Sequence, residues 1–171
     1  MPSTVRQQII DAVLTRLRTI NVATVVSGSA GYYATNIGDK VYEWRDLSTM
    51  PFDGANDSDL EALSLSDFEE TASQEIKSAH DKELKLEVRF ASNKDSTSES
   101  AAERGRKIIA DIEKCIGVDR YWTVSAVRLA VDTRVPEKNE MSVEQSGRIV
   151  VAGRVIFAIK YRNRSFDPYT L

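Results

Sequence analysis

The residues of this chain that could do chemistry together are two carboxylates and a lysine. Asp67 lies upstream of the run Glu83-Leu84-Lys85. Carboxylates on two neighbouring strands can hold Mg²⁺, and a lysine beside them can stabilise the charge that develops as a phosphodiester is cleaved. The spacing therefore raises the hypothesis of a Mg²⁺-dependent nuclease. A Glu-x-Lys run also arises by chance on a strand that alternates charged and apolar residues, so a non-catalytic interpretation stays open.

The other reactive residue types are isolated in the sequence. His80 is the only histidine and Cys115 the only cysteine, too few for an internal disulfide or a zinc site. The glycine-rich run at 27–32 lacks the lysine of a phosphate-binding loop. Cys115 falls on the apolar line of an expected helix, which favours a core side chain. We therefore predict no catalytic centre, no metal site and no cofactor.

Composition predicts an ordinary globular domain. The chain has 171 residues, of which 42% are hydrophobic and 29% charged, and its formal net charge of −3 argues against a dedicated nucleic-acid binder. No apolar run approaches the roughly 18 residues that a membrane span needs. The first ten residues lack the basic and then apolar pattern of a secretory signal. The sequence thus predicts one soluble domain over 1–171, made in the cytoplasm.

Two helices and several strands are expected to position these residues. Apolar residues at helical spacing predict helices over 4–20 and 97–116. Alternating residues predict strands over 40–46, 60–68, 83–90, 127–135 and 148–161. The alternation is clearest over 83–90. The pattern predicts an α+β fold: a mainly antiparallel sheet of about four to five strands, with the two helices packed on one face.

Capping residues and glycines predict where these elements begin, end and bend. Thr4 with Gln7 and Ser96 with Glu99 have the spacing of helix N-terminal caps. Gly117 follows the second helix, where a glycine commonly ends a helix. A glycine within the last strand, at position 153, predicts a bulge or bend there.

Charge is distributed unevenly along the chain. Residues 46–76 contain nine acids and no lysine or arginine, which predicts an acidic loop insert. The last strand carries bases on one face with Ile156, and a solvated strand face seldom holds such apolar residues. We expect either a helix of this chain or a neighbouring copy to cover that face. The interface residues predicted for the second case are Arg148, Arg154, Ile156, Lys160 and Arg162 against Asp59, Glu61 and Asp67.

The order of elements resembles the tail terminator (tail completion) proteins of long-tailed bacteriophages. The resemblance covers nearly the whole chain. It begins with the helix over 5–20 and the run Gly31-Tyr32-Tyr33-Ala34-Thr35-Asn36-Ile37-Gly38, which leads into Val41-Tyr42-Glu43-Trp44-Arg45. It continues in the strand and helix over 84–116 and ends with Ile159-Lys160-Tyr161-Arg162 and a short Asp167-Pro168 tail.

The resemblance implies a structural virion protein without catalysis. Such proteins form a hexameric ring at the head-proximal end of the tail tube, end tube polymerisation and dock the tail to the head–neck connector. The implied partners are further copies of the chain, the tail tube protein and connector proteins, with no membrane and with genomic DNA only passing through the lumen. The implied location is the neck region of the virion tail. A head–tail joining (neck) protein or a tail tube component stays open as an alternative.

Two loops are our candidates for contact with the tail or the neck. They span 27–39 and 50–59, and both are rich in glycine or other turn-forming residues. The unlike acidic and basic surfaces predicted above imply a heterologous contact, which builds rings or filaments. The candidate loop residues are Tyr32, Tyr33, Asn36, Phe52 and Asp53.

Overall fold

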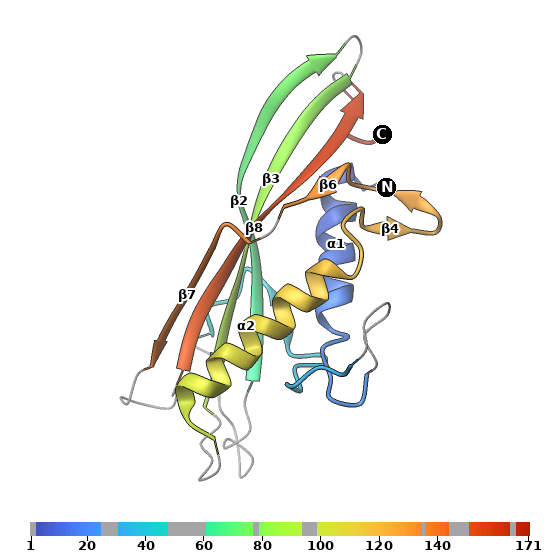
Figure 1. Ribbon diagram of the computed structural model, residues 1–171. Helices are drawn as coiled ribbons and strands as arrows, with labels where there is room; N and C mark the ends of the chain where they lie inside the picture. The colour runs from blue at the N-terminus through green and yellow to red at the C-terminus, as the bar shows by residue number, and fades with distance from the viewer. Residues whose placement is uncertain are drawn as a thin grey trace.

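The computed structural model describes residues 3–24, 31–47, 61–76, 79–93, 99–134, 136–143, 151–164 and 167–171. Within these residues, two helices and a mixed six-stranded sheet make an α+β fold (Figure 1). The helices are α1 (Val5–Leu17) and α2 (Ala101–Gly117). The sheet is formed by β1 (Val41–Glu43), β2 (Glu61–Ile76), β3 (Ala79–Ser92), β6 (Asp132–Thr133), β7 (Lys138–Val143) and β8 (Val151–Arg164). A separate hairpin contains β4 (Thr123–Val124) and β5 (Val127–Arg128).

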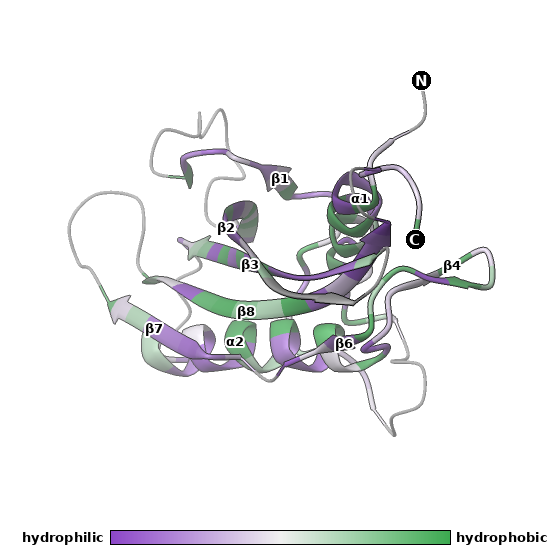
Figure 2. Ribbon diagram, turned by 90° about the horizontal axis from the view of Figure 1, so that it is seen from above, coloured by the Kyte–Doolittle hydropathy of each residue, from purple (hydrophilic) through white to green (hydrophobic). Residues whose placement is uncertain are grey.

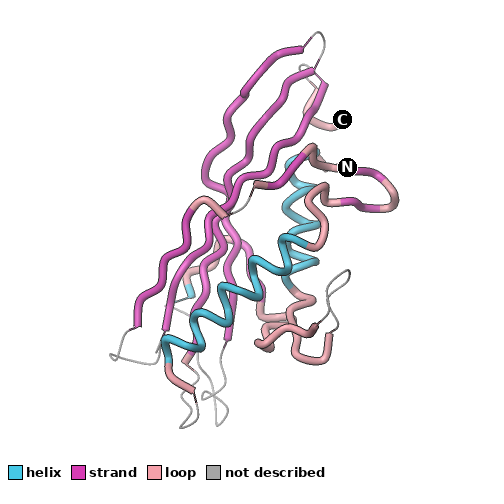
Figure 3. Tube along the Cα trace, viewed as in Figure 1, coloured by secondary structure: helices cyan, strands magenta, loops and turns pink. Residues whose placement is uncertain are grey.

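The antiparallel pair of β3 and β8 runs through the middle of the sheet. Both strands have 14 residues, and their register is unbroken from Ala79 opposite Arg164 to Ser92 opposite Val151. Together with β2, they extend well beyond the ends of the helices (Figure 3). Because side chains alternate along a strand, one face of this pair is apolar, as predicted for β3. The buried side chains on that face of β3 are Leu84, Leu86, Val88 and Phe90.

Both helices pack on this apolar face. Buried side chains of α1, α2, β3 and β8 belong to a single core cluster, and α2 lies along β8 when the molecule is seen from above (Figure 2). The Thr4 hydroxyl accepts a hydrogen bond from the Gln7 amide and caps α1, as the sequence predicts. The N-terminal cap of α2 is Ser100 rather than the predicted Ser96.

A buried ion pair and a buried carboxylate attach α2 to its surroundings. Arg104 donates to Glu61 at the start of β2, and both side chains are buried. Asp111 accepts hydrogen bonds from the Ala34 amide at 2.9 Å and the Thr35 amide at 2.7 Å. Since a buried charge needs compensating partners, these contacts determine where α2 lies relative to β2 and to the segment 31–37.

The sheet differs from the prediction in direction and in strand number. It is mixed rather than mainly antiparallel, because β1 pairs parallel with β2. It has six strands within the described residues, against the four to five predicted. Alternation of residue types carries no information about the direction of a neighbouring strand, so the parallel edge could not be read from the sequence.

Three segments have a different structure from the predicted one. The strand predicted over 60–68 is confirmed in its described part, but β2 continues to Ile76, where the acidic loop insert was expected, and 48–60 lie outside the described residues. The segment 138–143, expected to be part of a connection, forms β7 at the edge of β8. The expected strand over 127–135 is instead divided between β5 and β6, which belong to different sheets.

Gly153 is required by close packing and not by a bulge. The register of β8 with β3 continues through this residue, which lies opposite Phe90. A Cβ atom at position 153 would lie 2.3 Å from the carbonyl oxygen of Glu140 and 2.5 Å from the Phe90 ring. The bulges are in β2, between Asp67 and Glu69 and between Ala72 and Gln74. Likewise, Gly117 is the last residue of α2 and not a left-handed cap beyond it.

We predict that Gly153→Ala lowers the free energy of unfolding by about 1–3 kcal/mol, because the added methyl group overpacks a site next to backbone. Gly117→Ala is the matched control, since a Cβ atom there meets nothing within 4 Å. Thermal or urea unfolding of both variants measures the difference. Equal stability of the two variants would contradict the close packing described at Gly153.

Cys115 is a core side chain, as the sequence predicts, and we expect it to be inert in the folded protein. Burial raises the pKa of its thiol to about 11, so the nucleophilic thiolate is scarce near neutral pH. A disulfide reagent at pH 8 should therefore label Cys115 only slowly until denaturant is added. Rapid labelling of the native protein would show that this part of the core opens readily.

Candidate functional site

The hypothetical nuclease residues lie on opposite faces of the sheet. Asp67 faces α1, where it accepts hydrogen bonds from Arg6 Nε at 2.8 Å and from Trp44 Nε1 at 2.9 Å. Glu83 and Lys85 point away from the helices, since they alternate with the buried Leu84 and Leu86. The sheet therefore separates Asp67 from the other two residues. In the part of the chain that the structure describes, no cluster of three metal-ligating side chains occurs.

Glu83 and Lys85 take part in ion pairs on the outer face of the sheet, the face opposite the helices. Arg134 lies 3.4 Å from Glu83 and Glu69 lies 3.2 Å from Lys85. Glu69 and Lys85 lie opposite each other on the neighbouring strands β2 and β3, a position typical of the cross-strand charge pairs that stabilise a sheet. Arg134, which follows β6, reaches Glu83 from beyond β8. These side chains contribute to the fold and are not assembled into a catalytic site.

Two basic side chains of β8, those of Arg154 and Arg162, are matched by carboxylates of the same chain. Arg154 lies 2.9 Å from Glu87 on β3 and 2.5 Å from Glu140 on β7. Arg162 donates two hydrogen bonds to Asp81, from Nε to Oδ1 at 2.5 Å and from Nη2 to Oδ2 at 3.1 Å. The Arg162 guanidinium lowers the pKa of Asp81, and Lys138 and Arg154 lower the pKa of Glu140. The outer face is therefore a ladder of paired charges.

This arrangement contradicts the predicted charge-complementary interface at Glu61 and Asp67, while the rest of that interface stays a prediction. Glu61 is buried against Arg104, and Asp67 is held by Arg6, so neither acid is available to a neighbouring copy. Within the described residues, the outer face is not covered by a helix of this chain, which was one of the two expectations, and its covering by a neighbouring copy stays a prediction. Neither helix lies on it, whereas Leu47 packs there on Ala62 and Ala91. Ile156 and Lys160 are half-buried, and Arg148 and Asp59 lie outside the described residues.

Of the five predicted contact-loop residues, two are exposed, one is buried and two lie outside the described residues. Tyr32 and Asn36 are exposed, as a contact role requires. Tyr33 is buried in the core cluster, and burial raises its pKa. Tyr33 is therefore a structural residue that attaches its loop to the core. Phe52 and Asp53 lie outside the described residues.

Trp44 is an exposed aromatic residue that the sequence analysis did not single out. Its side chain is 62% exposed, and its backbone has a φ of 52°, in the left-handed region that few non-glycine residues adopt. The hydrogen bond from its indole nitrogen to Asp67 holds the ring in place. Phe68, which directly follows Asp67 at the β2 bulge, is also half exposed. Bulges commonly re-aim side chains in this way.

The β4–β5 hairpin forms a second apolar surface. Val124 and Val127 lie directly opposite each other in the hairpin, and both are about half exposed. Ser125 and Ala126 between them have φ values of 49° and 68°. Two positive φ values are the mark of a type I′ turn, which usually needs glycine or asparagine. The hairpin is therefore tight and projects from the body of the protein (Figure 1).

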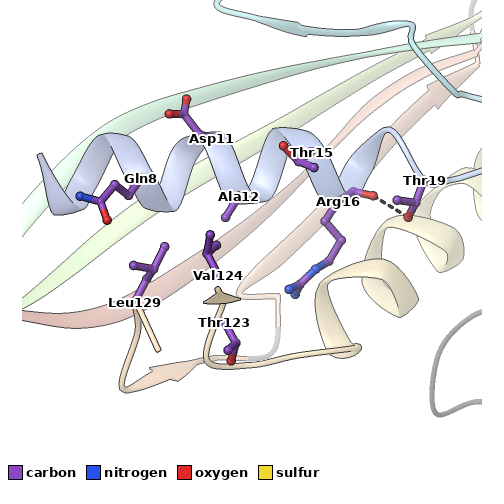
Figure 4. A pocket seen from close by; sticks show the side chains of 9 residues that line it. All are labelled: Gln8, Asp11, Ala12, Thr15, Arg16, Thr19, Thr123, Val124 and Leu129. Atoms are coloured by element: carbon purple, nitrogen blue, oxygen red, sulfur yellow. Dashed lines mark hydrogen bonds between the residues drawn. The ribbon is translucent and has the colours of Figure 1, made fainter. Parts of the chain in front are cut away.

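A groove lies between this hairpin and α1 (Figure 4). Its volume is about 480 Å³, within the range of about 300–1,000 Å³ typical of binding pockets. Ala12, Val124 and Leu129 provide apolar side chains, and Asp11 and Arg16 lie at its polar side. Arg16 is held by stacking on Trp122, with its guanidinium carbon 4.0 Å from the ring centre. The groove is thus a preformed, mainly apolar surface beside a helix.

Comparisons with known proteins do not assign the chain to a family. No protein-family model matches it, and no curated protein matches it either. Of the helices in the described residues, neither is long and apolar enough to cross a membrane.

We predict that Arg154→Glu lowers the melting temperature more than Arg162→Glu does. Arg154 faces Glu87, whose side chain is only 7% exposed, so charge reversal leaves a buried carboxylate beside a second acid. The pair of Arg162 with Asp81 is more exposed and lies near the end of the sheet. Thermal unfolding of the two variants compares them. Equal melting temperatures would contradict the assignment of Arg154 to the fold.

Proposed function

We propose that this protein is a structural virion protein of the tail-terminator type, which forms a ring at the head-proximal end of a phage tail tube. The order of the described elements supports this proposal. An N-terminal helix is followed by the 31–40 segment and the edge strand β1, and then by the pair of β3 and α2 and the long strand β8. The C-terminal tail returns to the first helix, where Pro168 accepts a hydrogen bond from the Val5 amide at 2.9 Å.

The observation that carries the proposal is the presence of two unlike apolar surfaces on one small chain. One centres on Trp44 beside β1 and the other on the β4–β5 hairpin. Exposed apolar patches of this kind mark protein–protein contact sites. Since the two surfaces differ, each can bind the other on a neighbouring copy, and such heterologous contacts close into rings when the rotation allows it.

The proposal assigns no chemistry to the chain. Ending tube growth requires only that the ring occupies the tube end and offers no site for another tube subunit. The ring's other side would then contact the connector proteins. The separation of Asp67 from Glu83 and Lys85 agrees with a role of this kind, because the cleavage hypothesis needs all three side chains at one metal ion.

The proposal is tested with tail tubes assembled from the cognate tube protein. Purified protein is added to the tubes, which are then given fresh tube subunits and examined by negative-stain electron microscopy. We expect a density at one end of each tube and growth only at the uncapped end, because the ring blocks addition of subunits. An unrelated acidic protein of similar size is the control. Tubes that elongate normally and have bare ends would overturn the proposal.

A further inference from the structure

We infer that Trp44 of one copy docks in the groove between α1 and the β4–β5 hairpin of the next copy. The inference rests on the proposed ring and names the contact that builds it. It replaces the charge-based interface expected from the sequence, whose residues are mostly paired within the chain.

Trp44 is preorganised for binding in the single chain. Its left-handed backbone is a strained conformation, and strain of this kind persists where the surroundings enforce it. Here Asp67 accepts the indole hydrogen bond while Arg6 holds Asp67. A ring already fixed in place loses little conformational entropy on docking. Tryptophan is also enriched among the residues that dominate binding energy at protein interfaces.

The groove offers an aromatic ring apolar side chains to pack against. Ala12 on α1 faces Val124 and Leu129 of the hairpin segment, so apolar surface is available on two sides (Figure 4). The volume of about 480 Å³ leaves room for a large side chain and part of the backbone that carries it. Filling it would remove the exposed faces of Val124 and of Trp44 from water together, which is the main source of binding free energy at such contacts.

The charges beside the two surfaces are complementary. Glu43 and Arg45, both exposed, flank Trp44 in the chain, and Arg45 stacks on Tyr42. Asp11, which lines the groove, is exposed on α1. Arg128 lies on the hairpin, outside the lining of the groove, where it is exposed and stacks on Tyr121. One acid and one base on each side can therefore pair across the contact. Such pairs at an interface favour the correct orientation of the partners.

The positions of the two surfaces exclude a contact within one molecule and favour a chain of copies. β1 lies on one side of α1 and the β4–β5 hairpin on another (Figure 2). Trp44 follows β1 directly, whereas the groove opens between α1 and the hairpin. Each copy thus uses one surface toward each neighbour, which is the geometry of a heterologous ring.

Two kinds of variant test this contact by complementation. Trp44→Ser removes the docking side chain but keeps the groove, and Val124→Asp spoils the groove but keeps Trp44. We expect each variant alone to be monomeric by light scattering at concentrations where the native protein assembles. An equal mixture of the two should form a discrete complex of two copies, because one intact contact remains and cannot propagate. Ala12→Lys, on α1, should behave like Val124→Asp, which separates loss of the groove from disruption of the hairpin.

Tryptophan fluorescence reports the same contact directly. The sequence has two tryptophans, and Trp122 is already fully buried, so a blue shift on assembly comes from Trp44. Tyr169→Ser and Val143→Asp change exposed residues of similar type outside both surfaces and should leave assembly unchanged. A native protein that assembles while the mixed variants stay monomeric would overturn the inference and leave the proposed ring intact. A native protein that stays monomeric without a blue shift would overturn it as well, and the tube-end experiment then decides the proposed function separately.

Discussion

The alternation of side chains along the β3–β8 pair is the constraint on which the rest of the structure depends. Its unbroken register places Leu84, Leu86 and their partners on one face, and burying that face requires both helices. Every other residue of these strands must then face the opposite way, where charges find partners across the strands. The two-sided pattern thus separates the core from a charged surface and also separates Asp67 from Glu83 and Lys85.

The pairing of charges within the chain determines which side chains remain for contacts in the proposed assembly. Cross-strand pairs such as Arg154 with Glu87 occupy the outer face, and the pair of Arg104 with Glu61 is buried under α2. Paired charges gain little from a new partner, because binding must first remove the existing one. In the proposed ring, contacts between copies therefore fall to the exposed apolar side chains, which gain free energy when they leave water. Among the exposed apolar side chains of the described residues are Trp44, which follows the short strand β1, and the two valines of the β4–β5 hairpin.

In the proposed ring, with Trp44 docked in the groove, the same elements serve both the core and the contact between copies. The long strands and two helices share one hydrophobic core, and the groove lies on the side of α1 left open by that core. One face of α1 thus contributes apolar side chains to the core, and another face of the same helix lines the groove. A ring built from such contacts needs no disorder-to-order transition in the described residues, since both the tryptophan and the groove are formed within the single chain.

Local patterns in the sequence determined the elements with strong periodicity. The helix capped by Thr4, the apolar line that includes Cys115 and the alternation from Leu84 to Phe90 all follow from spacing alone, because neighbouring residues decide them. Tertiary structure decided the parallel edge strand β1, the division of 127–135, and the need for Gly153, which depends on the Phe90 ring and the Glu140 carbonyl. It also decided which acids pair with Arg154 and Arg162 and that Trp44 is exposed. These properties depend on contacts between residues distant in the sequence. The pattern of residues along one strand does not show which residues will lie next to that strand in the fold.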